Sequence, residues 1–122
     1  MTSQRRRHAA HCAATMTDFD KARAAHKALT DFFARHPKGR LEREALDDVY
    51  DLCKQAATAV NDAGCRQAVR KIESYSLMLC SAEPPRGADF VRLRVQNALA
   101  SFRSTLRAIE AGSRSPEMNT DF

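Results

Sequence analysis

Residues 95–109, with the sequence VQNALASFRSTLRAI, decide the fold of this 122-residue chain. Their large apolar side chains are spaced by 4, 3, 4 and 3 positions, which places all of them on one narrow stripe of an α-helix. They are Val95, Leu99, Phe102, Leu106 and Ile109. Such a stripe packs against other helices, so this stretch predicts a helical bundle rather than a sheet.

Three earlier segments carry apolar residues at the same helical period. With the stretch above they predict four helices, at about residues 18–35, 41–63, 65–82 and 88–111. Thr17 is placed to cap the first helix, and Pro and Gly residues break the chain at 36–39 and 83–87. We therefore expect an all-α protein, an antiparallel up-down four-helix bundle over residues 17–112, with polar N- and C-terminal tails at 1–16 and 113–122.

The connection between the second and third helices has two interpretations. Gly64 is suited to a left-handed helix cap, which would make residues 41–63 and 65–82 an antiparallel hairpin. The alternative is one long bent helix over 41–82, because a lone glycine inside a helix costs only about 1 kcal/mol. We favour the hairpin, since one long helix would leave its apolar stripe without partners in so short a chain.

The first sixteen residues differ from the rest, because they hold Arg5, Arg6 and Arg7 but no acidic residue. They lack the apolar core of a signal peptide, and we expect a disordered basic tail. Met16-Thr17 repeats Met1-Thr2 immediately before the first helix, so we hypothesise that Met16 is the biological start. No run approaches the length of about 20 apolar residues that a membrane span needs, and the expected location is the cytoplasm, with no membrane partner.

The cysteines and histidines give no strong metal or redox signal. None of the cysteine pairs has the C-x-x-C spacing, and without a secretory signal we expect reduced thiols. The cysteines are Cys12, Cys53, Cys65 and Cys80. His8, His11 and Cys12 form an H-x-x-H-C cluster that lacks a fourth ligand, so we expect adventitious binding at most. The sequence therefore predicts no metal site and no cofactor.

The positive charge of the chain is the main indication of its partners. The formal net charge is +5. A basic edge lies beside the apolar stripe of the last helix, and the third helix adds further cations. The residues are Arg92, Arg103 and Arg107, then Arg66 and Arg70. One interpretation is a solvated flank that pairs in part with acids of the second helix, namely Glu44, Asp47, Asp48 and Asp51. The other is a surface for an acidic protein or for nucleic acid, bound through its phosphates because no base-reading motif is present.

Three apolar or aromatic residues lie off the helical stripes. They are Tyr50, Phe90 and Leu93. Off-stripe residues of this kind pack under loops or form an exposed patch that seeks a partner. We take these three as candidate interface residues, with a homodimer as one candidate assembly.

The sequence offers little support for catalysis. None of the four histidines has an acid three residues before it, as the di-metal sites of helical bundles require, and no glycine-rich phosphate loop is present. His26 is a weak candidate for histidine phosphotransfer, because the residues after it differ from the usual pattern in such domains. We therefore expect a non-enzymatic bundle without catalytic residues that acts through protein–protein interaction, as an adaptor, chaperone-like or regulatory module. The alternative is a nucleic-acid-associated regulator that uses the basic third and fourth helices.

Overall fold

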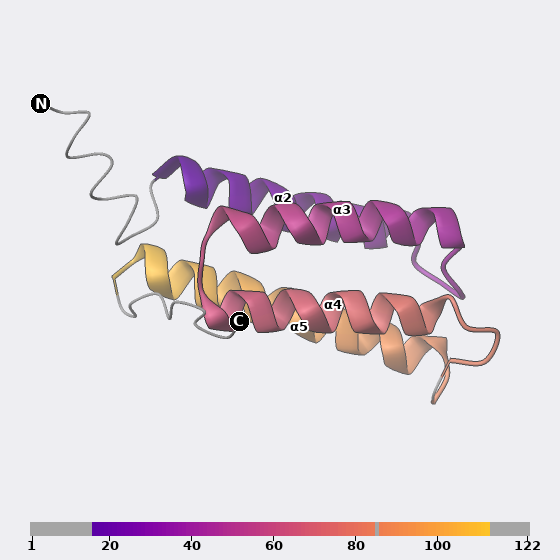
Figure 1. The fold of residues 1–122 in the computed structure, drawn as a ribbon. Coiled ribbons are helices and arrows are strands. Elements are labelled where there is room, and N and C mark those ends of the chain that lie inside the picture. Colours follow the sequence, from indigo (N-terminus) through magenta and orange to yellow (C-terminus); the bar gives the residue numbers. More distant parts are fainter. Residues whose placement is uncertain (1–15, 85, 113–122) are drawn as a thin grey trace, which may run out of the picture.

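The computed structural model describes residues 16–84 and 86–112. This part of the chain forms four helices: α2 (Met16–Arg35), α3 (Arg43–Ala59), α4 (Ala63–Leu79) and α5 (Ala88–Glu110). Each helix packs against the one before it, and α5 closes the arrangement by returning to α2 (Figure 1). The predicted all-α fold, an antiparallel up-down four-helix bundle, is confirmed.

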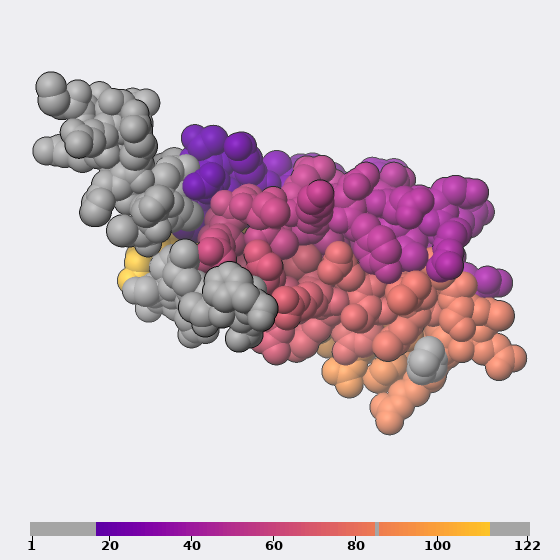
Figure 2. Space-filling view, viewed as in Figure 1, coloured from indigo at the N-terminus to yellow at the C-terminus, as the bar shows by residue number. Residues whose placement is uncertain are grey.

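The core lies where the apolar stripes of the four helices meet. All five residues of the stripe that predicted the fold are buried on α5, and Val95 and Phe102 are fully inaccessible. The helices α4 and α5 make the most extensive contact of the four neighbouring pairs, whereas α2 and α5 make the least extensive one. The space-filling view shows α3 and α4 side by side across one face (Figure 2). The lightly packed seam between α2 and α5 is the place where the bundle surface can be hollowed.

The second and third predicted helices are separate, so the interpretation as one long bent helix is wrong. The break lies earlier than expected, because α3 ends at Ala59 and Val60 is extended with φ −126° and ψ 116°. Asp62 then caps α4, and its carboxylate accepts a hydrogen bond from the amide of Cys65 at 2.8 Å. Gly64 lies inside α4 and does not have a positive φ, which corrects its predicted role as a left-handed cap. The buried Asp62 cap stabilises the start of α4 and offsets the loss of helix stability caused by Gly64.

The other helix bounds differ from the prediction by small amounts. The first helix begins at Met16, so Thr17 lies in its first turn and is not the cap. α3 begins at Arg43, and the amide of Leu41 just before it donates to the carbonyl of Leu79 at 2.9 Å. This bond ties the start of α3 to the end of α4. Within the described ranges, none of the helices combines the length and apolar character needed to cross a bilayer. The predicted N-terminal tail was 1–16, and its last residue, Met16, is instead the first residue of α2. The rest of that tail, the predicted tail at 113–122 and the cluster of His8, His11 and Cys12 fall outside the described residues, and the biological start stays a hypothesis.

Candidate functional site

The five predicted basic residues do not share one face. Arg66 is half-buried and Arg70 is exposed on α4, which lies diagonally across the bundle from α2. Arg103 and Arg107 are exposed on α5 and line a groove against α2. The continuous basic surface expected over the third and fourth helices therefore divides into two separate places.

Arg92 is a structural residue of the bundle rather than a solvated basic side chain. It is only 9% exposed, and its guanidinium donates to three backbone carbonyls of the α2–α3 loop. Those carbonyls belong to His36, Lys38 and Gly39. Burial lowers the pKa of Arg92, but a guanidinium is not deprotonated in proteins, so Arg92 is charged. The guanidinium of Arg92 is therefore engaged by the loop carbonyls and is not available to a partner.

The acids of the second helix do not neutralise the basic residues of the fourth. In the described residues the ion pairs are Arg23 with Asp20, Arg23 with Glu110, and Lys27 with Asp31. The acids Glu44, Asp47, Asp48 and Asp51 lie on α3, which is diagonal to α5 in the bundle. The predicted pairing between these helices is wrong, because the bundle order keeps them apart.

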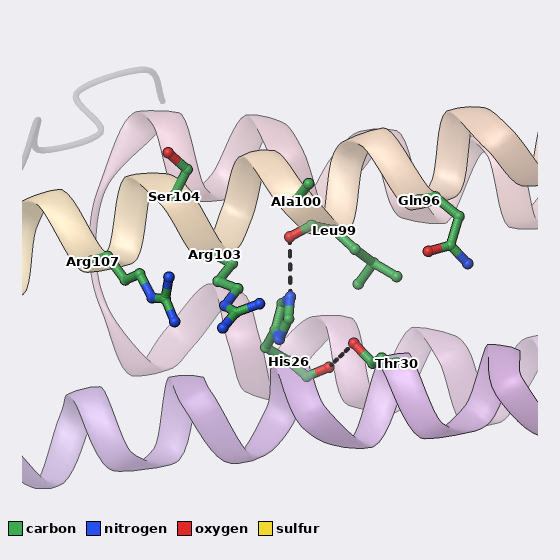
Figure 3. A pocket seen from close by; sticks show the side chains of 8 residues that line it. All are labelled: His26, Thr30, Gln96, Leu99, Ala100, Arg103, Ser104 and Arg107. Carbon is green, nitrogen blue, oxygen red and sulfur yellow. Dashed lines mark hydrogen bonds between the residues drawn. The ribbon is translucent and has the colours of Figure 1, made fainter.

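A groove between α2 and α5 brings together the residues that could bind a ligand. Two adjoining hollows, of about 440 Å³ and about 310 Å³, share His26, Thr30, Arg103 and Arg107. In the close view, the guanidinium groups of Arg103 and Arg107 project from α5 toward α2, and His26 reaches across from α2 (Figure 3). We call this feature the α2–α5 groove.

His26 is the central residue of the α2–α5 groove. Its Nε2 lies 3.0 Å from the carbonyl oxygen of Leu99, so this nitrogen carries the proton and donates it to that oxygen. The ring stacks on Phe102 with 5.9 Å between the ring centroids. Burial lowers the pKa of His26, and the positive charges of Arg103 and Arg107 lower it further. The imidazole is therefore neutral at pH 7 and forms part of the groove wall.

The α2 side of the groove carries two more cations that the sequence reading missed. Arg23 and Lys27 line the smaller hollow. Arg23 pairs with Glu110 across the groove, so one carboxylate at its end is already occupied. Arg23 lies three residues before His26, so helical spacing around that histidine could have revealed it. Lys27 directly follows His26, a spacing that does not predict a shared helix face.

The candidate interface residues fall in two places. Tyr50 on α3 is half-buried, and burial raises the pKa of its hydroxyl. Phe90 and Leu93 lie near the start of α5, next to the loop that projects at one end of the bundle (Figure 2). The ring of Phe90 is held between two guanidinium groups, those of Arg86 at 5.1 Å and Arg94 at 5.0 Å from its centroid.

Leu77 and Met78 are exposed in the last turn of α4, at the end of the bundle where α5 begins with the half-buried Phe90 and the exposed Leu93. We call Leu77, Met78, Phe90 and Leu93 the loop-end surface. Large apolar side chains exposed together at one end are the feature that distinguishes interaction surfaces from scattered surface residues.

The described thiols have a packing role. Cys53 and Cys65 are fully buried, and burial raises the pKa of Cys53 to about 12. A thiol with so high a pKa is a poor nucleophile at neutral pH. Across residues 16–84 and 86–112, no cluster of three or more His, Cys, Asp or Glu side chains is arranged to hold a metal ion.

Comparison with protein-family models, with curated proteins and with solved structures found no match to this chain.

Proposed function

We propose that this chain is a non-enzymatic helical-bundle protein that acts through protein–protein interaction, as an adaptor, chaperone-like or regulatory module. The observation that carries the proposal is the loop-end surface. Its three aliphatic members are the exposed large apolar residues of the described chain: Leu77 is 47% exposed, Met78 38% and Leu93 56%.

The composition of the loop-end surface supports an interaction role. Aromatic residues, methionine and arginine are enriched in protein interfaces, and Phe90 lies between Arg86 and Arg94 beside Leu93. Complete burial of one leucine side chain by a partner is worth about 1.5–3 kcal/mol. The arginines would favour a partner with an apolar centre and an acidic margin. A second copy of the chain is one such candidate, because Glu83 and Asp89 flank the same surface in the sequence.

Site-specific photocrosslinking in the native host tests the proposal. A photoreactive amino acid is placed at position 93 and, as a matched control, at position 54, where Lys54 is exposed on α3. Position 93 should give a discrete adduct that is weakened when Leu77 is replaced by Glu, and position 54 should not. An adduct at twice the mass of the chain would identify a homodimer. The same adducts from both positions, or none from position 93, would overturn the proposal.

Nucleic-acid binding is the second candidate function. It is supported by Arg103 and Arg107, which have no carboxylate partner among the described residues. Binding through phosphates would weaken steeply with salt, and the R103Q/R107Q double variant should flatten that dependence. No binding to a random duplex at about 50 mM salt would remove this candidate.

Histidine phosphotransfer through His26 receives no support from the geometry. A phosphotransfer histidine presents a ring nitrogen to its partner domain from an exposed position. His26 is instead half-buried between α2 and α5, and one of its two ring nitrogens, Nε2, is hydrogen-bonded to the carbonyl oxygen of Leu99.

A further inference from the structure

We propose that the α2–α5 groove is a binding site for a small molecule that carries a phosphate monoester and an apolar body. This site lies apart from the loop-end surface and does not depend on the interaction proposed there.

The anionic part of the ligand is inferred from Arg103 and Arg107. They lie one helical turn apart on α5, and both guanidinium groups project into the groove (Figure 3). Two like charges at this spacing destabilise a helix, and no carboxylate of the described residues pairs with either of them. The nearest acid on the same helix face, Glu110, is occupied by Arg23. An anionic ligand would supply the missing counter-charge.

The number of donors favours a phosphate monoester over a carboxylate. Each guanidinium carries five N–H donors, so the two groups together present more donors than one carboxylate, with about four lone-pair sites, can accept. A phosphate monoester offers three oxygens and close to two negative charges at pH 7. Gln96 lines the same hollow, but it lies on the other side of His26 from the two arginines, so the phosphate is assigned to the arginines alone (Figure 3).

The apolar part of the ligand is inferred from apolar residues of α5 that line the groove beside the arginines and from His26 on α2. Leu99 and Ala100 line the larger hollow, and Leu106 lines the smaller one. His26 stacks on Phe102, and its Nε2 is occupied by the carbonyl of Leu99, so the ring adds an apolar face. A hollow of about 440 Å³ lies in the size range of small-molecule pockets. An anionic head at the arginines and an aromatic or aliphatic body beside His26 therefore fit this groove.

The test is a titration of the ¹⁵N-labelled full chain with phenyl phosphate, followed by amide chemical shifts. We expect saturable shifts in residues 26–30 and 96–107. The R103Q/R107Q double variant should raise the dissociation constant by about tenfold or more, because it removes hydrogen bonds in which both partners are charged. The matched control is R70Q/R94Q, which removes two exposed arginines outside the groove and changes the net charge equally. It should change the constant by less than about twofold.

Three further binding measurements test the inferred chemistry of the ligand: one with a lysine variant, one with benzoate and one with inorganic phosphate. R103K/R107K keeps the charge but loses the planar forks, and it should bind more weakly than the wild type and more tightly than R103Q/R107Q. Benzoate and inorganic phosphate should both bind more weakly than phenyl phosphate. No saturable shift, equal weakening by both Arg-to-Gln double variants, or equal binding of benzoate or inorganic phosphate would overturn the proposal. Far-ultraviolet circular dichroism of each variant separates lost binding from lost folding.

Discussion

Arg92 on α5 donates two hydrogen bonds to a single oxygen, the carbonyl of Gly39, which lies 53 residues earlier in the chain. The donors are Nε at 3.1 Å and one terminal nitrogen at 2.8 Å. The same terminal nitrogen also donates to the carbonyl of Lys38 at 3.2 Å, and the other terminal nitrogen donates to the carbonyl of His36. Gly39 has a φ of +73°, a conformation that favours glycine. In this turn the carbonyls of His36, Lys38 and Gly39 all accept hydrogen bonds from Arg92. One side chain thereby satisfies the backbone acceptors that follow α2.

We predict that Arg92→Lys destabilises the protein by about 2 kcal/mol, because an ammonium cannot reproduce the fork that serves three carbonyls at once. Urea unfolding monitored by circular dichroism measures the change. Arg70→Lys, an exposed site on α4, is the control and should change the free energy of unfolding by less than about 0.5 kcal/mol. Equal effects of the two variants would show that the loop contacts contribute nothing to stability.

The cap of α4 gives a second prediction. Asp62 is fully buried and accepts the amide hydrogen of Cys65, so Asp62→Ala should cost about 1–2 kcal/mol in the free energy of unfolding. Asp62→Asn retains a side-chain acceptor and should cost less. Asp47→Ala on the exposed surface of α3 is the matched control, because it makes the same chemical change without removing a cap. Chemical denaturation of the three variants would contradict the prediction if Asp62→Ala and Asp47→Ala unfolded alike.

A third prediction concerns the dependence of stability on pH. Burial and the charges of Arg103 and Arg107, which face His26 from α5, lower its pKa below the ordinary value of 6.5. Arg23 and Lys27 flank it on α2. As the pH falls below about 6.5, His26 is therefore protonated more readily in the unfolded chain than in the folded chain. This difference favours the unfolded chain, so the free energy of unfolding decreases. The stabilising contribution of His26 is fully present above that pH.

His26→Gln isolates this contribution, because glutamine can still donate to the carbonyl of Leu99 but does not titrate. The free energy of unfolding is measured at about pH 7.5 and about pH 5.5, on either side of the histidine range. The loss on acidification should be smaller in His26→Gln than in the wild type. His36→Gln, at an exposed position, should keep the wild-type loss. Identical losses in the wild type and His26→Gln would refute the assignment.

The described thiols should react in a fixed order. Cys80 is half-buried, whereas Cys53 and Cys65 are fully inaccessible and burial raises the pKa of Cys53 to about 12. In a Cys12→Ser background, we expect a thiol reagent to modify Cys80 in the folded protein and the other two only after unfolding. Mass spectrometry of the modified peptides over time measures the order. The prediction fails if Cys53 is modified as fast as Cys80 without denaturant.

Periodicity predicted the fold well, because the burial of a helix face depends on residues close in sequence. Val95, Leu99 and Phe102 are buried as their spacing required. The break before α4 lies earlier than the predicted break at Gly64, because Asp62, two residues before this glycine, caps the helix. Asp62 followed by a helical run is itself a local start signal, and it locates the break correctly.

The candidate site was harder to predict, because its residues come together from different helices. Arg92, Arg103 and Arg107 share one edge of α5, yet Arg92 meets the α2–α3 loop and the other two meet a groove. A helical wheel cannot separate these environments. The order of helices in the bundle also decided that Asp47 and Asp51 on α3 would not neutralise them.

The closed α2–α3 loop has a consequence for how two copies of this chain could associate. Helical bundles exchange a terminal helix between copies when the loop before the next helix straightens into a hinge. Here Arg92 holds that loop in its folded-back form, so α2 stays with its own chain and domain swapping is disfavoured. Replacing Arg92 would therefore remove the contacts that keep this loop folded back and would favour an exchange of α2 between copies.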